Sequence, residues 1–281
     1  MPVFNRVVIV GLGLMGGSLG LALKRKRLAR RVIGLSRSRA TIRHAIRRGA
    51  IDAGTTVPAE AVRDADLVIL ATPVDLIARQ GAALARRMKR GSVLTDLGST
   101  KAEIVRRLDV AVPKGVSFVG SHPLAGSERR GLAAAQADLY EGTTCVITKT
   151  SRTNPGASAR MARLWRGLGS RVVTLSPSTH DELLAQVSHL PHVLAFALTR
   201  SAGAKAQRVA PRSFLEMTRI AKSDPRLWDA ILLSNRRALL AAMARFEREW
   251  RQARAALTRA NAAGLRRWLT QAQRQRERLD A

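Results

Sequence analysis

The chain has one cysteine, few aromatic residues and no long uncharged segment. Cys145 stands alone among 281 residues, so neither an intrachain disulfide nor a cysteine-based zinc site can form. The longest uncharged stretch, residues 7–23, has 17 residues and contains five glycines, so we expect neither a membrane span nor a signal peptide. A single thiol suits a reducing compartment, and we expect a cytoplasmic protein.

Acidic residues are scarce as well. Lys and Arg number 49 against 20 Asp and Glu, for a formal net charge of +29, and 41 of the 49 are Arg. Such a charge raises the question of a polyanionic partner such as nucleic acid. Aromatic residues, at 4%, are too few for a base-stacking surface, and the chain has neither a basic tail nor zinc-finger spacing. We therefore expect no nucleic-acid partner and interpret most arginines as solvated surface.

Apolar runs rich in β-branched residues alternate with helix-like segments in the first part of the chain. The expected strands are residues 7–10, 32–35, 67–71, 93–97, 116–119, 143–148 and 172–175. Continuous apolar strands separated by helices are typical of a doubly wound parallel sheet. After residue 177 the strand signal ends and successive helices follow. The sequence therefore predicts an α/β Rossmann domain over residues 1–177 and an all-α domain over residues 178–281.

One long helix of the second part carries an apolar stripe. Its members recur at intervals of four and three: Leu239, Met243, Phe246, Trp250, Ala253 and Leu257. This heptad-like spacing suits packing against another helix, either in the core or at a subunit interface. We expect a homodimer formed through the helical domain.

A glycine-rich turn follows the first expected strand. Residues 11–16 (GLGLMG) form a GxGxxG motif between a β-branched strand and a helix, the context in which this motif binds dinucleotides. Gly11 permits the tight turn, Gly13 the approach of a pyrophosphate, and Gly16 the close packing of helix on strand. The helix N-terminus then faces the phosphates. The expected cofactor contacts at this turn are Gly11, Gly13, Leu14, Met15 and Gly16.

The second strand lacks the acid that NAD sites place about 20 residues after the motif. Ser36 stands there, followed by Arg37 and Arg39, and the first 51 residues contain twelve basic residues and no Asp or Glu. Serine and arginine can bind a ribose 2′-phosphate, which a carboxylate would repel. We predict NADP preference, read by Ser36 and Arg37 with Arg39 in support. The alternative is that these arginines merely reflect the Arg-rich composition and that NAD is used.

A histidine follows the fifth expected strand. His122 lies in the segment SHPLAGSE at residues 121–128. Because ligands of an open parallel sheet bind beyond the carboxyl ends of its strands, His122 is well placed for acid–base chemistry near neutral pH. An isolated histidine of this kind could equally be a loop residue held by hydrogen bonds. Three further motifs favour the functional reading: residues 96–101 (DLGSTK), 188–192 (SHLPH) and 218–225 (TRIAKSDP).

This set of motifs resembles the prephenate/arogenate dehydrogenase family of tyrosine biosynthesis. The resemblance covers nearly the whole chain in order, through residues 11–16 (GLGLMG), 71–74 (ATPV), 96–101, 121–128, 188–192 and 218–228 (TRIAKSDPRLW). It implies an oxidoreductase that converts prephenate, arogenate or both to 4-hydroxyphenylpyruvate or tyrosine. A hydride leaves C4 for the nicotinamide, the 4-hydroxyl loses its proton, and CO2 departs as the ring becomes aromatic. The residues leave open which of the two substrates is used.

The resemblance also implies roles for individual residues. His122 matches the family's catalytic histidine, which takes the proton of the 4-hydroxyl. Ser99 matches the serine beside it, although Ser99 could also cap the helix that follows. Arg219 matches the arginine that binds the ring carboxylate. The expected substrate contacts are Arg219, His192, Ser127, Glu128, His189 and Trp228, and the further expected cofactor contacts are Thr72 and Pro73.

Several of these assignments have alternatives. His189 and His192 stand three apart, a spacing found in metal sites, but no further ligand accompanies them and the family uses no metal, so we expect none. Trp228 suits core packing as well as the mouth of an active site. Several family members carry Asp three residues before the carboxylate-binding Arg, where this chain has Glu216, so the geometry of Arg219 is left open.

Two other functions fit part of the sequence. Other dehydrogenases of the β-hydroxyacid type share the two-domain layout, but they usually use a lysine of the helical domain. Lys205 and Lys222 are the only lysines after Lys149, and neither is well supported in that role. The non-enzymatic alternative is a redox-sensing dinucleotide binder that contacts nucleic acid through its basic surface. Turnover of prephenate or arogenate would exclude both.

Overall fold

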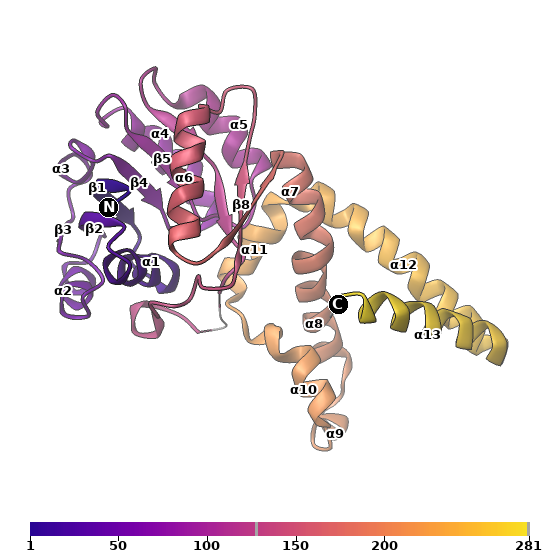
Figure 1. Ribbon diagram of the computed structural model, residues 1–281. Coiled ribbons are helices and arrows are strands. Elements are labelled where there is room, and N and C mark those ends of the chain that lie inside the picture. Colours follow the sequence, from indigo (N-terminus) through magenta and orange to yellow (C-terminus); the bar gives the residue numbers. More distant parts are fainter. Residues whose placement is uncertain (127–128, 280–281) are drawn as a thin grey trace. The chain divides into compact units, whose positions relative to one another are not determined.

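A computed structural model describes residues 1–126 and 129–279 (Figure 1). The chain divides into two compact units, Met1–Asn235 and Arg236–Ala281. The first unit holds every strand of the described residues together with several helices that follow them. This division differs from the change of pattern near residue 177, because helices beyond that point pack against the α/β layers within the first unit. The functional domain boundary near residue 177 stays a prediction.

The strands follow the expected runs closely. They are β1 (Phe4–Val10), β2 (Ala29–Leu35), β3 (Ala53–Thr55), β4 (Leu67–Leu70), β5 (Val93–Asp96), β6 (Ser117–Val119), β7 (Ser121–Pro123), β8 (Thr144–Thr148) and β9 (Arg171–Leu175). Two of these, β3 and β7, were not expected, since three residues are too short to show a period or an apolar run.

After β9 the described residues form helices and turns and no further strand, as the sequence predicts. They are α1 (Leu14–Arg25), α2 (Arg39–Arg47), α3 (Pro58–Val62), α4 (Val74–Ala85), α5 (Ala102–Ala111), α6 (Pro155–Gly167), α7 (Pro177–Leu184), α8 (Leu190–Ser201), α9 (Ala204–Gln207), α10 (Arg212–Thr218), α11 (Pro225–Ser234), α12 (Arg236–Thr258) and α13 (Ala262–Glu277). A π-helical segment, Ala185–His189, joins α7 to α8, and 3₁₀ turns cover Leu132–Ala134 and Arg219–Lys222.

Six parallel strands form the main sheet in the order β3-β2-β1-β4-β5-β6. This arrangement confirms the doubly wound α/β class expected from the sequence. A second sheet, β7-β8-β9, was not expected, and in it β7 runs antiparallel to β8. Only Gly120 separates β6 from β7, and its carbonyl accepts the N–H of Thr148 at 2.9 Å. His122 therefore lies on a short strand and not in a loop.

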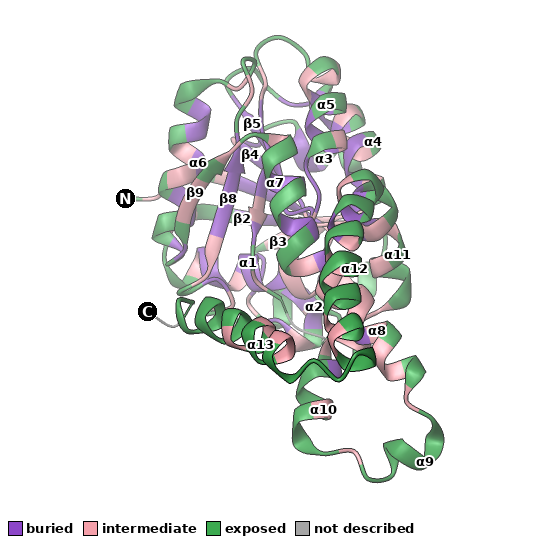
Figure 2. Cartoon of the chain, turned by 90° about the vertical axis from the view of Figure 1, so that its right-hand side faces the viewer, coloured by how far each residue is buried: buried purple, intermediate pink, exposed green. Residues whose placement is uncertain are grey.

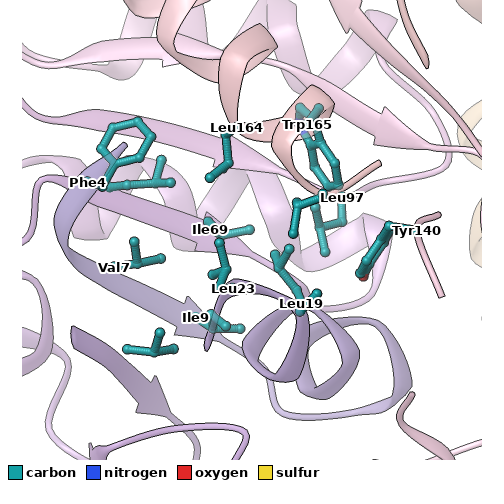
Figure 3. Close-up of a cluster of buried hydrophobic side chains, with 14 of the residues drawn as sticks. Phe4, Val7, Ile9, Leu19, Leu23, Ile69, Leu97, Tyr140, Leu164 and Trp165 are labelled. Atoms are coloured by element: carbon teal, nitrogen blue, oxygen red, sulfur yellow. The ribbon is translucent and has the colours of Figure 1, made fainter. Parts of the chain in front are cut away.

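Both faces of the main sheet are apolar, which explains the continuous hydrophobic runs. Val7 and Ile9 of β1 point to one face, where they belong to a buried cluster with residues of α1 and α6 (Figure 3). Val8 and Val10 point to the other face and join a cluster with residues of α4 and α5. Figure 2 shows the buried residues concentrated in these strands. The helical layers thus hold the carboxyl ends of the strands in place.

The second compact unit consists of α12 and α13. Asn261 begins α13 by accepting the N–H of Gly264 at 2.9 Å, so the helical run is interrupted near Asn261. The indole of Trp268 donates to Glu249 at 3.1 Å and links the two helices. The stripe residues Trp250 and Leu257 are 62% and 63% exposed. Among the described residues, no helix is long and apolar enough to cross a membrane.

Candidate active site

The turn after β1 has the shape that a bound dinucleotide needs. Gly11 has φ +94°, and a Cβ built there would lie 2.7 Å from the carbonyl oxygen of Ala71. A Cβ at Gly16 would lie 2.0 Å from the carbonyl oxygen of Gly11, so only glycine lets α1 approach so closely. Gly13 is exposed and has no atom within 4 Å of its Cβ direction, which leaves room for a pyrophosphate. No side chain of the described residues caps α1, and its first N–H groups face this space.

The expected adenosine-side residues cluster at the end of β2. Ser36 is half-buried, and its hydroxyl accepts the N–H of Ser38 at 3.3 Å. Arg37 and Arg39 are exposed, and neither forms an ion pair within residues 1–126 and 129–279. No Asp or Glu occurs in the sequence of this turn. The site therefore offers hydroxyl and guanidinium groups where a carboxylate would serve an unphosphorylated ribose.

Thr72 and Pro73 follow β4 beside the same turn. Pro73 is exposed at the start of α4, and Thr72 is half-buried with its hydroxyl donating to Gln80 at 2.7 Å. Their position after β4 agrees with contact to the cofactor. The Thr72 hydroxyl already donates its hydrogen bond to Gln80, so it can only accept one from the cofactor.

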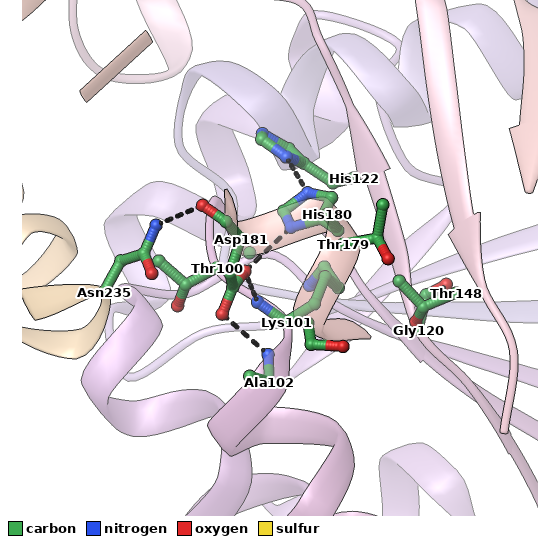
Figure 4. A network of polar contacts seen from close by, with 12 residues as sticks. Thr100, Lys101, Ala102, Gly120, His122, Thr148, Thr179, His180, Asp181 and Asn235 are labelled. Atoms are coloured by element: carbon green, nitrogen blue, oxygen red, sulfur yellow. Dashed lines mark hydrogen bonds and ion pairs between the residues drawn. The ribbon is translucent and has the colours of Figure 1, made fainter. Parts of the chain in front are cut away.

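His122 is linked to His180 of α7, and through it to Asp181 (Figure 4). Neither residue was expected at the site from the sequence. Its Nδ1 lies 2.8 Å from Nε2 of His180, and Nδ1 of His180 lies 2.8 Å from the Asp181 carboxylate. His180 is fully buried, whereas His122 is half-buried and keeps one edge accessible. The three side chains form a hydrogen-bonded row that ends in a carboxylate.

The buried surroundings keep His122 neutral. Burial lowers the pKa of His122 well below its ordinary value, and the positive charge of Lys101 lowers it further. Burial also lowers the pKa of His180, although its bond to Asp181 opposes this effect. A neutral imidazole can accept a proton, so these shifts favour His122 as a general base.

Asp181 also holds the beginning of α5. Its two carboxylate oxygens accept the backbone N–H groups of Lys101 at 2.7 Å and Ala102 at 2.9 Å. The helix is thus capped by a residue 79 positions away, and not by Ser99, which the sequence had offered as an alternative cap. Ser99 is half-buried in the loop between β5 and α5, and its role beside His122 stays a prediction.

A buried ion pair lies beneath this row. The ammonium of Lys101 bonds to Asp96 at the end of β5, and both side chains are completely buried. Asp96 also accepts the N–H of Gly98 at 2.9 Å and that of Ser121 at 3.3 Å. The pair therefore ties β5 and the start of α5 to β7, the strand that carries His122.

The motif SHLPH lies at the join between the π-helical segment and α8. Pro191 has no N–H and would clash with the carbonyl four residues earlier in a regular helix, which accounts for the wider π turn. His189 is 1% exposed, and its Nδ1 lies 3.0 Å from the Asn235 amide nitrogen, which also donates to the Asp181 carbonyl. Burial lowers the pKa of His189 to about 4. Its Nε2 has no hydrogen-bond partner among the described residues.

His192, Trp228 and Arg219 come together on a second side of the site. The rings of His192 and Trp228 stack at 3.4 Å with an angle of 21°. Burial lowers the pKa of His192, and the charge of Arg219 lowers it further, which places this guanidinium nearby. Glu216 bonds to Arg212 at 2.8 Å. Trp228 is half-buried and packs against the core, which confirms the core-packing alternative, while its place at the mouth of an active site stays a prediction.

Two expected substrate contacts, Ser127 and Glu128, lie outside the described residues. Asp224 begins α11 by accepting the N–H of Arg226 at 3.0 Å, as the Asp-Pro pair predicts. It also pairs with Arg130 at 2.9 Å. Within the described residues, no group of three or more His, Cys, Asp or Glu side chains is arranged to hold a metal ion.

Four residues of the site were not assigned from the sequence: Lys101, His180, Asp181 and Asn235. Lys101 belonged to a recognised motif, but nothing in the motif shows that it is buried. His180 and Asp181 open the first helix after the strands, and an adjacent histidine and acid were the only signal. Their link to His122 depends on how α7 packs against the strand β7, which no local sequence pattern reveals.

Comparison with known proteins gives a consistent result over the whole chain. Residues 19–174 match the family model "Prephenate dehydrogenase, nucleotide-binding domain", and residues 176–271 match "Prephenate dehydrogenase, dimerization domain". The Bacillus subtilis prephenate dehydrogenase is 34% identical over 84% of this chain, which spans 66% of that protein. The Zymomonas mobilis cyclohexadienyl dehydrogenase is 34% identical over 92% of this chain and 90% of its own length. The solved Aquifex aeolicus prephenate dehydrogenase, in complex with hydroxyphenyl propionate and NAD+, is 31% identical with a TM-score of 0.91 over 98% of both chains.

Proposed function

The chain belongs to the prephenate dehydrogenase family, and on this premise we propose that it oxidatively decarboxylates prephenate, arogenate or both with a nicotinamide cofactor. The observation that carries the proposal is His122, a histidine with a lowered pKa that follows the carboxyl end of β6, in a sheet whose β1 ends in the glycine turn. The family match supports the substrate class, and the buried base supports the chemistry.

The residues of the site supply the groups that the reaction needs. The 4-hydroxyl must lose its proton while C4 loses a hydride, and the bound nicotinamide supplies the hydride acceptor. His122 takes the hydroxyl proton, with Ser99 beside it. Arg219 binds the ring carboxylate, because a planar, permanently charged guanidinium can form two parallel bonds to it.

The remaining histidines bind and orient the substrate in this proposal. His192 and Trp228 form a flat aromatic wall near Arg219. His189 offers a buried nitrogen that has no partner in the described residues, and a polar group of the substrate would satisfy it. The family resemblance implies that Ser127 and Glu128 complete the substrate contacts, with Glu128 near the substrate side chain.

NADP is the proposed cofactor. The support is the serine and two unpaired arginines at the end of β2 in place of an acid. The Aquifex aeolicus protein was solved with NAD+, so the two cofactors must be compared directly. We expect a higher kcat/KM with NADP, and we expect Arg37→Gln to reduce it for NADP while leaving NAD unchanged. Arg47→Gln, a change at an exposed arginine at the far end of α2, is the matched control.

The decisive experiment measures reduced-cofactor absorbance with both cofactors and both substrates. Turnover of prephenate, of arogenate or of both supports the proposal and assigns the substrate. If neither substrate is turned over with either cofactor, the proposed function is wrong. A clear NAD preference would refute only the cofactor assignment.

A homodimer formed through residues 178–281 is also proposed. The support is the apolar stripe of α12 and the match of residues 176–271 to a domain described as a dimerization domain. Sedimentation at micromolar concentration should show the mass of a dimer, and a monomer would argue against it. The cytoplasmic location stays a prediction.

A further inference from the structure

In the row His122–His180–Asp181, each hydrogen bond has a donor and an acceptor. The order of donors and acceptors along the row decides which nitrogen of His122 can act as the base. A neutral imidazole carries one N–H donor and one accepting nitrogen, so a partner that fixes one nitrogen also fixes the other. If Nδ1 of His122 bears the hydrogen, Nε2 has a free lone pair. If Nδ1 accepts, Nε2 bears the hydrogen and cannot take another proton.

The direction begins at Asp181, because an ionised carboxylate can only accept hydrogen bonds. Its oxygens already accept the N–H groups of Lys101 and Ala102 at the start of α5. The carbonyl of the same residue accepts the amide of Asn235 at 2.7 Å, so backbone and side chain are both held. The nitrogen facing this carboxylate, Nδ1 of His180 at 2.8 Å, must therefore be the donor.

His180 passes this direction on to His122. Burial keeps His180 neutral by lowering its pKa, so with its hydrogen on Nδ1 the other nitrogen, Nε2, is an acceptor. That acceptor lies 2.8 Å from Nδ1 of His122, which must then be the donor. His180 is 0% exposed, so water does not compete for its Nε2. The lone pair of His122 is left on Nε2, away from the row.

The charged groups around the row agree with this direction. The ammonium of Lys101 is the nearest cation, and Asp96 pairs with it in the buried interior. Its positive charge disfavours protonation of both His122 and His180. His189, the other histidine near His122, is neutral because burial lowers its pKa to about 4. No other carboxylate is recorded in contact with either ring of the row within the described residues, so Asp181 alone sets its polarity.

We propose that His180 and Asp181 are positioning residues that hold His122 as its Nδ1–H tautomer and leave Nε2 as the atom that accepts the substrate's hydroxyl proton. The inference rests on the proposed function for the identity of that hydroxyl, but the tautomer assignment does not. When Nε2 takes the proton, the Nδ1–H of His122 still points at a lone pair of His180, and the Asp181 carboxylate stabilises the positive charge through it.

The tautomer can be read in the protein without substrate or cofactor. The chain has five histidines, so ¹⁵N-labelled imidazole signals can be assigned by single substitutions. At pH 7.5 we expect His122 to show a protonated Nδ1 and an unprotonated Nε2. In Asp181→Asn the amide can keep its oxygen on the N–H of Ala102 and turn its NH₂ toward Nδ1 of His180, with loss of the bond from the Lys101 N–H. This reverses the row, so His122 should then carry its hydrogen on Nε2.

Kinetics test whether the tautomer matters for the reaction. We expect Asp181→Asn to lower kcat by about 10²- to 10⁴-fold with little change in substrate KM, as when a triad carboxylate that orients a histidine is replaced. His180→Phe removes the acceptor but leaves the bonds from Asp181 to α5, so it covers the case in which Asp181→Asn fails to fold. It should lower kcat at least tenfold and leave His122 as a mixture of tautomers.

Asp66→Asn is the matched control. Asp66 also accepts two backbone N–H groups, from Asn5 and Arg6 at 3.0 and 2.8 Å, but lies just before β4 at the opposite end of the strand from the site. Its replacement should lower the free energy of unfolding without altering kcat or the His122 signals.

The outcomes separate the two proposals. A wild-type His122 with its hydrogen on Nε2 overturns the inference, as does a reversed tautomer that leaves kcat unchanged. A His122 pattern that neither variant alters also overturns it. If the wild-type protein turns over neither substrate, the proposed function fails, while the spectra of the free protein still decide the tautomer.

Discussion

At the scale of single residues, burial lowers the pKa of His122, which suits the role of general base at neutral pH that we propose for it. An exposed histidine titrates near pH 6.5 and is partly protonated in many cells. His122 stands on a strand, with one nitrogen bonded to another histidine and its pKa lowered mainly by burial. It is therefore ready to accept a proton before substrate arrives. The same surroundings oppose the charged product of that step, and Asp181 at the end of the row offsets this cost.

The first prediction concerns His122 itself. In His122→Asn the amide can still donate to His180, so the protein should fold and bind the cofactor. The variant should lose about 10²- to 10⁴-fold in kcat, because general base catalysis contributes about that much. Stopped-flow or steady-state absorbance measures the loss. Turnover within about threefold of wild type would mean that the base is another group.

The pH profile of the wild-type enzyme gives a second prediction. His122 must be neutral to act, and its pKa lies below the ordinary value of 6.5. Activity is lost as the pH falls through that lowered pKa, so the acid limb of kcat/KM should fall below pH 6.5. An acid limb at pH 7 or above would contradict the buried, desolvated environment of His122.

Arg219 carries the third prediction. Arg219→Gln removes the proposed partner of the ring carboxylate, so substrate KM should rise by about 10- to 100-fold, with a smaller effect on kcat. Cofactor KM should not change, since the glycine turn is a separate part of the site. Arg212→Gln, at an exposed arginine that pairs with Glu216 one turn into α10, is the control. An unchanged substrate KM would remove the assignment.

At the scale of elements, the start of α5 organises the site. Its first N–H groups bond to Asp181 of α7, and the Lys101 ammonium at the same place bonds to Asp96 of β5. A strand end, a helix N-terminus and a second helix are therefore joined through polar groups that have no access to water. Such a junction is held in one geometry, because any shift would leave a buried charge without its partner.

The fourth prediction tests that junction. Lys101→Met leaves the Asp96 carboxylate buried without its cation and should lower the free energy of unfolding by about 3–5 kcal/mol. Urea denaturation measures the change. The matched control is Lys24→Met, which removes a partly exposed pair with Asp52 and should have an effect of about 1 kcal/mol or less. An equal decrease in the free energy of unfolding in the two variants would show that the buried Lys101–Asp96 pair stabilises the fold no more than the exposed pair does.

The SHLPH motif between α7 and α8 shows what a local sequence pattern can predict about the contacts of its two histidines. Pro191 and the two histidines of SHLPH were recognised from the sequence, and a regular helix would place His189 and His192 on one face. Both rings pack against Trp228, His192 by stacking at 3.4 Å and His189 edge-on at 6.1 Å. The spacing thus predicts the common neighbourhood of the two histidines, whereas the contact of His189 with Asn235, 46 positions away, depends on the tertiary structure.

At the scale of the whole molecule, buried neutral histidines link stability to pH. The pKa of His189 is about 4 in the folded chain and near 6.5 when unfolded. Between these values the unfolded state binds the proton first, so the free energy of unfolding falls as the pH drops from 6.5 to 4. His189 alone accounts for roughly 3 kcal/mol of that fall, and the lowered pKa values of His122 and His180 act in the same direction.

The fifth prediction follows from this linkage. His189→Gln removes the titrating group, so the variant should lose roughly 3 kcal/mol less than wild type between pH 7 and pH 4. Denaturant unfolding at the two pH values gives the difference. Equal losses in the two proteins would mean that His189 is not desolvated in the folded state.

Much of the fold and part of the site follow from the sequence. The apolar runs predict seven of the nine strands that the described residues form in the two sheets, and the glycine motif predicts the turn where Gly11 and Gly16 admit no side chain. His122 was recognised from its motif and its place after a strand. The short β7 that carries it, and the sheet that β7 forms, were not, because three residues show no period.

The sequence by itself determined the order of elements, the dinucleotide turn and the family, since these depend on local spacing and short motifs. The tertiary structure alone decided the partners of the base. His122 and His180 stand 58 positions apart, and Asp181 and the α5 N–H groups it accepts about 80. Contacts over such distances depend on how helices cross the ends of strands, and burial at those crossings sets the charge of each histidine. The high net charge, present in the composition from the start, takes no direct part in this arrangement, which works by excluding water.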